Sequence, residues 1–420
     1  MITDPLIFAR ALHFAATMLA SGTVAFIVLV TEPAARAKMP AEFAVLRVRL
    51  VALTWVALAA ALLSGAVWLV LLASDVLGAS IADVCLHGDL WPVLADTRFG
   101  LVWTGRLLLA LLLAALLFRP TMRMLQLATT AALLALPALV GHAGATPGTV
   151  GDIHLASDML HLLAAGAWLG GLPALLLLLV HARRATQPVW DDFAIIATRR
   201  FSVLGIFSVG ILLATGVINS WNMLSGPSDL VASNYGRLVA LKIGVFGAMV
   251  ALAAVNRFYL TPRLPEPGAW RALQRNSLVE ILLGLCALLF VGILGTLPPA
   301  AHVHPEPAGV PPGAAFVHIH DVDVMVEATV DPGRAGRANV ALRVLREDFS
   351  RLPVQEVHLA LEPPGSGPHP AEETLTEQAD GTWIASDIVF SEPGVWTIRV
   401  IVTTKRGKHT VLDAPIVIEP

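Results

Sequence analysis

Charged residues are scarce in this sequence. Only 14% of its 420 residues are Asp, Glu, Lys or Arg, whereas 56% are hydrophobic. An average soluble domain has about 25% charged residues. The deficit excludes an ordinary soluble protein of this size, and we expect a multi-span membrane protein whose partner is a lipid bilayer and not nucleic acid.

Cysteines and familiar catalytic motifs are also scarce. The two cysteines are Cys85, in a loop, and Cys286, within an apolar stretch, so no disulfide framework is expected. No HExxH zinc-protease signature, glycine-rich phosphate loop or activated Ser or Cys nucleophile is visible. We therefore expect a protein that is not an enzyme.

Long hydrophobic runs dominate the first three quarters of the chain. A membrane-spanning helix needs about 20 apolar residues. Eight stretches meet this length, at residues 6–31, 50–74, 98–118, 122–142, 153–180, 201–222, 236–259 and 278–297. The sequence therefore predicts an all-α bundle of eight spans over residues 1–298.

Lys and Arg are missing from every second loop of this bundle. The loops at about 75–97, 143–152 and 223–235 contain Asp but no Lys or Arg, whereas the alternate loops are basic. Cytoplasmic loops carry the excess of Lys and Arg. Both termini are therefore predicted to be extracytoplasmic, which in a bacterium means periplasmic.

The composition changes after Leu297. Residues 299–315 form a Pro- and His-containing linker, and residues 316–420 contain about seven short runs of alternating apolar residues separated by turn residues. This pattern predicts a small extracytoplasmic β-sandwich of immunoglobulin-like type.

The fifth stretch carries ionisable side chains. His154, Asp158 and His161 lie at i, i+4 and i+7, and Trp168 follows on the same helical face. Ionisable groups within a span are costly and by default face a protein interior. Asp158 could also orient an imidazole, as carboxylates do behind metal-bound histidines. The alternative is a pair of interfacial histidines with a helix-capping carboxylate.

Other histidines fall in the same outer half of the bundle. The full set is His13, His142, His154 and His161, with Arg106 and Lys242 as buried pathway residues. Converging neutral imidazoles suit copper, zinc, iron or nickel. His154 and His161 are ~10 Å apart along a helix at 1.5 Å per residue. We therefore expect two layers, His154 with His142 at the mouth and His161 with His13 below.

Further predictions concern tryptophans and one carboxylate. Trp55, Trp68 and Trp103 fit an interfacial aromatic belt. Glu280, in the eighth stretch, is expected to pair with Arg271 or Arg275.

A second set of histidines precedes the sandwich. An auxiliary metal site could use His302, His304, His318 and His320, because the side chains at i and i+2 of a strand share a face. The alternative is a solvated, His-bearing linker.

Several motifs resemble the copper resistance protein D family of bacterial inner-membrane proteins. They are H-x6-H-L-L-A-A-G-A-W-L-G-G-L from His154, R-A-L-H-F from Arg10, F-G-x-x-W-x-x-R-L from Phe99, G-H at Gly141, Y-G-R-L-V-A-L-K from Tyr235 and S-L-V-E-I-L-L-G from Ser277. The C-terminal segment, with P-G-V-W-T-I-R-V, resembles a YtkA-like periplasmic domain.

The resemblance implies copper uptake or tolerance, with His13, His142, His154 and His161 at motif positions and a periplasmic copper-binding protein as a candidate partner. Copper transport is the leading interpretation. One alternative is a haem-binding electron-transfer protein that uses His161 with His13 or His142. The other is a copper chaperone or assembly factor that does not transport.

Overall fold

The computed structural model consists of two compact units, residues 1–303 and 304–420. It describes residues 4–40, 43–77, 80–86, 90–140, 148–185, 187–224, 226–264, 266–297, 310–320, 324–346, 350–363, 372–404 and 409–420. Each unit is described by itself.

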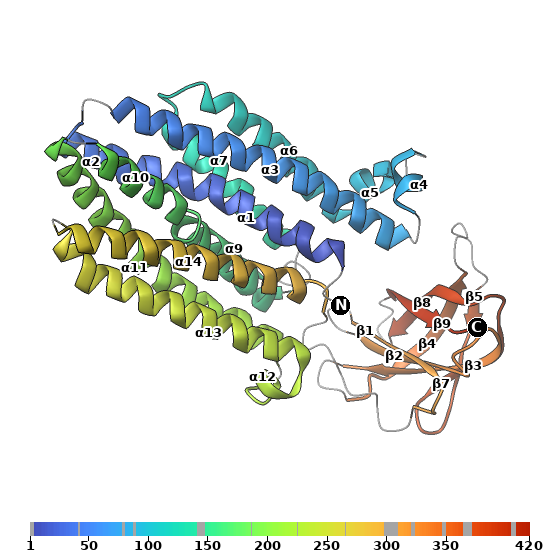
Figure 1. The fold of residues 1–420 in the computed structure, drawn as a ribbon. Helices are drawn as coiled ribbons and strands as arrows, with labels where there is room; N and C mark the ends of the chain where they lie inside the picture. The colour runs from blue at the N-terminus through green and yellow to red at the C-terminus, as the bar shows by residue number, and fades with distance from the viewer. Residues whose placement is uncertain are drawn as a thin grey trace. The chain divides into compact units, whose positions relative to one another are not determined.

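The first unit is a bundle of long helices (Figure 1). Its elements are α1 Pro5–Ala25, η1 Phe26–Thr31, α2 Glu32–Ala37, α3 Phe43–Leu77, α4 Ile81–Leu86, α5 Leu90–Asp96, α6 Arg98–Leu117, α7 Arg123–Ala135, η2 Leu136–Val140, α9 Gly148–Trp168, α10 Leu172–Arg184, α11 Pro188–Met223, α12 Asp229–Ala232, α13 Asn234–Val255, η3 Asn256–Leu260, η4 Thr261–Arg263 and α14 Pro267–Leu294. Within the described residues they form eight helical segments long and apolar enough to cross a membrane. The predicted eight-span bundle is confirmed.

Three helices begin well before the predicted spans. α3 begins at Phe43 and not at residue 50, α11 at Pro188 and not at 201, and α14 at Pro267 and not at 278. A hydropathy pattern detects only the part of a helix that crosses lipid. The helical hydrogen bonds continue through the basic residues beyond it.

The fifth span is broken near its middle. α9 ends at Trp168, and Leu169–Gly171 form a turn before α10 begins at Leu172. The turn lies against α1 so closely that a Cβ atom on Gly22 would come within 2.1 Å of the Gly170 carbonyl carbon. Only glycine allows this approach of two backbones, and small residues serve the same purpose at membrane helix crossings.

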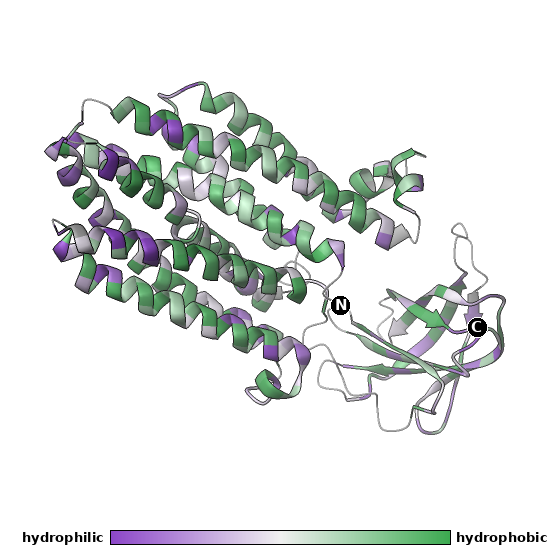
Figure 2. Cartoon of the chain, viewed as in Figure 1, coloured by the Kyte–Doolittle hydropathy of each residue, from purple (hydrophilic) through white to green (hydrophobic). Residues whose placement is uncertain are grey.

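The two ends of the bundle differ in charge. We call the end with the Arg- and Lys-containing loops the basic end and the opposite end the acidic end. At the basic end Lys38 lies 3.4 Å from Asp192, and Arg123 forms an ion pair with Glu32. Figure 2 shows hydrophilic residues gathered at this end and apolar residues along the spans.

The second unit consists of two antiparallel sheets. Its strands are β1 Ala315–His320, β2 Met325–Asp331, β3 Gly336–Leu345, β4 Val354–Glu362, β5 Glu372–Thr374, β6 Thr376–Glu377, β7 Trp383–Phe390, β8 Gly394–Thr404 and β9 His409–Ile418. The sheets have the orders β1-β2-β3-β7-β6 and β5-β4-β8-β9. Alternate side chains such as Val326, Val340 and Ile398 fill the core, as the period-2 pattern predicts. The predicted all-β class is confirmed.

Candidate functional site

The predicted histidine set is only partly described. His13, His154 and His161 are described, whereas His142 lies outside the described residues. Within the described part of the chain, no group of three or more His, Cys, Asp or Glu side chains is placed to hold a metal ion. The four-histidine copper site stays a prediction, and the described histidines have different surroundings.

His13 lies in the interior of the first half of the bundle, where it is 5% exposed. Its Nδ1 lies 2.9 Å from the Ala61 carbonyl oxygen of α3, and its Nε2 lies 2.5 Å from an Nη atom of Arg106 on α6. Arg106 is 4% exposed and also donates to the Leu133 carbonyl oxygen at 2.7 Å. The imidazole therefore joins α1, α3 and α6.

These contacts assign the tautomer of His13. A guanidinium has only N–H donors, and a carbonyl oxygen only accepts. Nε2 must therefore accept from Arg106, and Nδ1 carries the proton that goes to Ala61. The lone pair that a metal would need is already used by Arg106. In this geometry His13 positions a buried guanidinium.

Two tryptophans enclose this cluster. The rings of Trp68 and Trp103 lie 5.5 Å and 5.2 Å from the His13 ring, and both are buried. The Arg106 guanidinium lies 5.4 Å from the Trp103 ring, within cation–π range. The expectation that these tryptophans form an interfacial belt was therefore wrong. Hydropathy does not distinguish an aromatic facing lipid from one facing a buried cation.

His161 belongs to a different cluster, in the second half of the bundle. Its Nδ1 lies 2.9 Å from the Thr215 hydroxyl of α11. That hydroxyl lies 2.7 Å from the Ile211 carbonyl oxygen, to which it donates its only proton. Thr215 must then accept the proton of His161 Nδ1. This tautomer leaves the lone pair on Nε2, the atom that imidazoles commonly use to bind metal ions.

Charged and amide side chains surround His161. Asp158, one turn before it, accepts a hydrogen bond from Asn219 Nδ2 at 3.3 Å. Lys242 of α13 interacts electrostatically with both Asp158 and His161, and Tyr235 interacts with Asp158. Asp158 and Lys242, predicted to orient the histidines or to line the pathway, are therefore neighbours of His161, and a hydrogen bond from an imidazole to Asp158 stays a prediction. Thr215, Asn219 and Tyr235 were not predicted from the sequence as site residues, although an Asn within an apolar span is a visible signal.

The other two residues predicted on the fifth span are His154 and Trp168. His154 is 3% exposed. Trp168 is buried seven residues beyond His161, and its ring lies 6.2 Å from that of Phe246. Trp168 lines a cavity towards the basic end, and His161 does not line that cavity.

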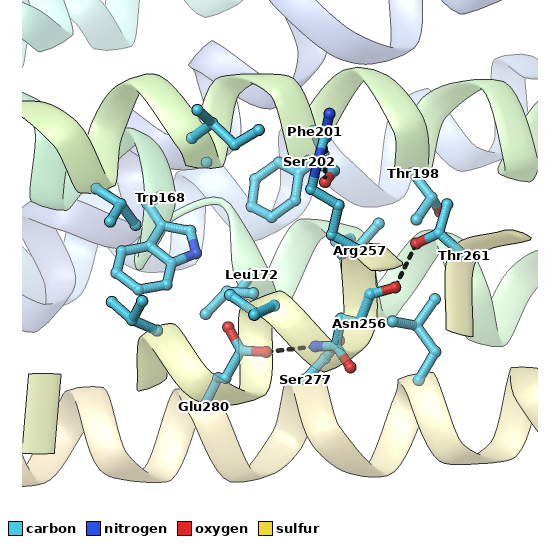
Figure 3. A pocket seen from close by; sticks show the side chains of 18 of the residues that line it. Trp168, Leu172, Thr198, Phe201, Ser202, Asn256, Arg257, Thr261, Ser277 and Glu280 are labelled. Carbon is cyan, nitrogen blue, oxygen red and sulfur yellow. Dashed lines mark hydrogen bonds between the residues drawn. The ribbon is translucent and has the colours of Figure 1, made fainter. Parts of the chain in front are cut away.

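This cavity contains a carboxyl group whose partner differs from the predicted one. Glu280 is 1% exposed, and its Oε1 accepts a hydrogen bond from Asn256 Nδ2 at 2.5 Å (Figure 3). Asn256 in turn accepts from Asn276 Nδ2 at 2.9 Å. The expected ion pair with Arg271 or Arg275 is not found among the described residues. The partner lies 24 positions away on another helix, which no local pattern could indicate.

In the second unit, His318 is the histidine of the predicted auxiliary site whose side chain the structure describes. His318 on β1 pairs in register with Glu327 on β2, and its Nδ1 lies 3.7 Å from the Glu327 carboxylate. Glu327 is also 3.3 Å from Arg343. His302, His304 and the side chain of His320 lie outside the described residues, so the predicted auxiliary metal site stays a prediction.

Comparison with known proteins places the bundle in a family. The model of the copper resistance protein D-like N-terminal domain matches residues 1–152, and that of copper resistance protein D matches residues 195–294. Copper resistance protein D of Pseudomonas syringae pv. tomato is 31% identical over 257 residues, which cover 57% of this chain and 80% of that protein. The chain belongs to the copper resistance protein D family.

Two other relatives extend the comparison. Inner membrane protein YebZ of Escherichia coli is 33% identical over 215 residues, covering 50% of this chain and 72% of YebZ. Copper transport protein CutJ of Bacillus subtilis is 28% identical over 278 residues, covering 64% of this chain and 47% of CutJ. No solved structure matches the chain significantly.

The motifs that resemble the copper resistance protein D family meet in space. His13, Trp103 and Arg106, from two motifs, form the first cluster. His161 and Lys242, from two others, belong to the second. Glu280, from the last motif, lies in the cavity at the basic half. The two family models match the first half and the last third of the bundle but not residues 153–194, so they leave out His161. The resemblance of the C-terminal unit to YtkA-like domains stays a prediction.

Proposed function

We propose that this protein is a non-enzymatic copper carrier of the bacterial inner membrane. Family membership makes it a copper-related membrane protein. Its relatives carry the names copper resistance protein D, copper transport protein CutJ and inner membrane protein YebZ. The proposal goes beyond the family in assigning transport, a binding residue and a direction of entry.

The orientation of the His161 ring carries the proposal. Thr215 fixes the ring through Nδ1, so the Nε2 lone pair is available to a copper ion. Partners that fix the tautomer of a metal-bound histidine typically raise metal affinity 10- to 100-fold. His13 lacks this property because Arg106 occupies its Nε2. We therefore propose that His161 binds the ion and His13 holds Arg106 in place.

The surroundings of His161 suit a site from which an ion must also leave. Lys242 and Asp158 are opposite charges that interact across α9 and α13. Asp158 adds attraction for a cation, and Lys242 limits it. Conduction requires binding that is strong enough for entry and weak enough for exit. His154, and His142 as predicted from the sequence, would capture the ion nearer the mouth.

The acidic end is the proposed entrance. Its loops carry Asp75, Asp83, Asp89, Asp96, Asp152 and Asp229 and no Lys or Arg. Such a surface concentrates cations. With the basic loops in the cytoplasm, both termini and the β-sandwich would be extracytoplasmic. There the sandwich could meet a periplasmic copper-binding protein.

The test is copper uptake into sealed vesicles that contain the purified protein. We expect uptake by the wild type, little uptake by His161→Ala and reduced uptake by Thr215→Val, which removes the hydroxyl that orients the ring. Thr54→Val is the matched control, because Thr54 is another buried threonine whose hydroxyl donates one turn back, to Leu50. Copper binding without uptake by the wild type would favour a chaperone.

A further inference from the structure

A cavity of about 220 Å³ lies towards the basic end of the bundle and is not used by the proposed copper site. Residues of α10, α11, α13, η3, η4 and α14 line it, together with Trp168 at the end of α9 (Figure 3). Most of the lining is apolar, and Glu280 provides its carboxyl group. The cavity is large enough for several water molecules at ~30 Å³ each.

Among the residues that the structure describes, the Glu280 carboxyl is held by an amide group and not by a cation. Asn256 donates to Oε1, and Asn276 donates to Asn256. Figure 3 shows the Asn256 amide directed at the Glu280 carboxyl. Asn256 begins the π-helical segment η3, whose wider turn is closed by a hydrogen bond from Thr261 N–H to the Asn256 carbonyl oxygen. Such π-helical turns occur frequently at functional sites.

The described charges around the cavity do not neutralise Glu280. Arg257 is the other ionisable side chain in the described lining, and its Nη1 donates to the Ser202 hydroxyl at 2.8 Å. The lining residues from α9, α10, α11 and α13 are apolar or hydroxyl-bearing. An ionised carboxylate in this place would be a buried charge without a counter-ion among the described residues, which is strongly unfavourable. A protonated carboxyl avoids that cost.

Two buried hydroxyls in the lining of the cavity offer places for water. Ser277, one turn before Glu280, is fully buried, and Thr198 is 3% exposed. Neither side-chain oxygen has a hydrogen-bond partner among the described residues. Buried polar groups are normally satisfied by protein or ordered water. Water in the cavity would satisfy both and connect Glu280 to the basic end.

We propose that Glu280 is a proton-binding site and that the cavity brings protons to it. The carboxylate takes up a proton to become a neutral acid that keeps its hydrogen bond from Asn256, and it releases that proton to water in the cavity. The donor set of one carboxylate, amides and hydroxyls is a poor match for Cu(I), which prefers sulfur and imidazole ligands. The site does not depend on the proposed copper transport.

Infrared difference spectroscopy of the purified, full-length protein tests this assignment. A protonated carboxyl has a C=O band that is separate from the bands of carboxylates and amides. We expect this band in the wild type at neutral pH, its reversible loss at alkaline pH and its absence from Glu280→Gln. Glu266→Gln is the matched control, because Glu266 is exposed just before α14.

The contrary results are equally specific. The proposal fails if the wild type has no such band, if Glu280→Gln retains it, or if Glu266→Gln removes it. Asn256→Leu provides a second measurement should Glu280→Gln fail to fold. Loss of the amide donor should shift the C=O band to higher frequency. An unshifted band would show that the protonated carboxyl is not the one that Asn256 contacts, which would overturn the proposal. None of these spectra requires copper, so failure of the transport proposal would leave this test intact.

Discussion

Replacing His13 with alanine removes the acceptor of a buried guanidinium. Arg106 would keep its bond to the Leu133 carbonyl but lose the one to His13 Nε2. A hydrogen bond to a charged group contributes about 1.5–3 kcal/mol. The missing ring also leaves a cavity against Trp68 and Trp103. We expect His13→Ala to lower the free energy of unfolding by about 3–5 kcal/mol.

His13→Gln distinguishes a positioning role from a ligand role. The Gln side-chain oxygen can accept from Arg106 where Nε2 does now, while the bond to Ala61 is weakened. The expected loss is then about 1 kcal/mol, the value of one ordinary hydrogen bond. Denaturant unfolding in detergent would measure both variants, and a copper titration would measure their binding. We expect His13→Gln to retain the wild-type copper stoichiometry.

The reasoning would be refuted by the opposite pattern. If His13→Ala and His13→Gln both unfold like the wild type and both lose one bound copper ion, the ring is a ligand and Arg106 does not depend on it. Equal and large destabilisation by both substitutions would also contradict the argument. It would show that the hydrogen bond accepted from Arg106 does not determine the stability of this cluster.

Three further predictions follow from the fold. Gly22→Ala should destabilise the bundle strongly, because the new methyl group would overlap the backbone between α9 and α10. Gly244→Ala should instead stabilise it by about 0.5–1 kcal/mol, because a Cβ atom there would have no neighbour within 4 Å. Thermal unfolding of the two variants measures the difference. Reporter fusions after Arg184 and after Pro299 should report opposite sides of the membrane, and the same side for both would make the topology wrong. The segment 310–420 should give a β-type circular dichroism spectrum and a cooperative thermal transition when expressed alone, and a helical or disordered spectrum would contradict its independence as a unit.

The sequence predicted the elements whose signal is local. Eight apolar runs and the alternating strands after Phe316 were sufficient to predict the fold class. The break after Trp168 also has a local signal, since Gly170, Gly171 and Pro173 interrupt an apolar run. A hydropathy window does not detect this break, because all three residues are compatible with lipid.

The polar clusters could be predicted only in part. His161, Asp158 and Lys242 are conspicuous inside apolar spans, and they do interact. That Arg106 takes the lone pair of His13 depends on how α6 packs on α1, which no spacing reveals. The partner of Glu280 likewise depends on packing between η3 and α14.

The most direct test of the account is a copper titration of the purified protein and its His161→Ala variant, with His13→Gln as the control. The wild type and His13→Gln should bind the same number of copper ions. His161→Ala should bind one fewer or bind that ion at least tenfold more weakly, because it has lost the Nε2 ligand that Thr215 orients. Full stoichiometry and unchanged affinity in His161→Ala would contradict the central claim that His161 binds the copper ion.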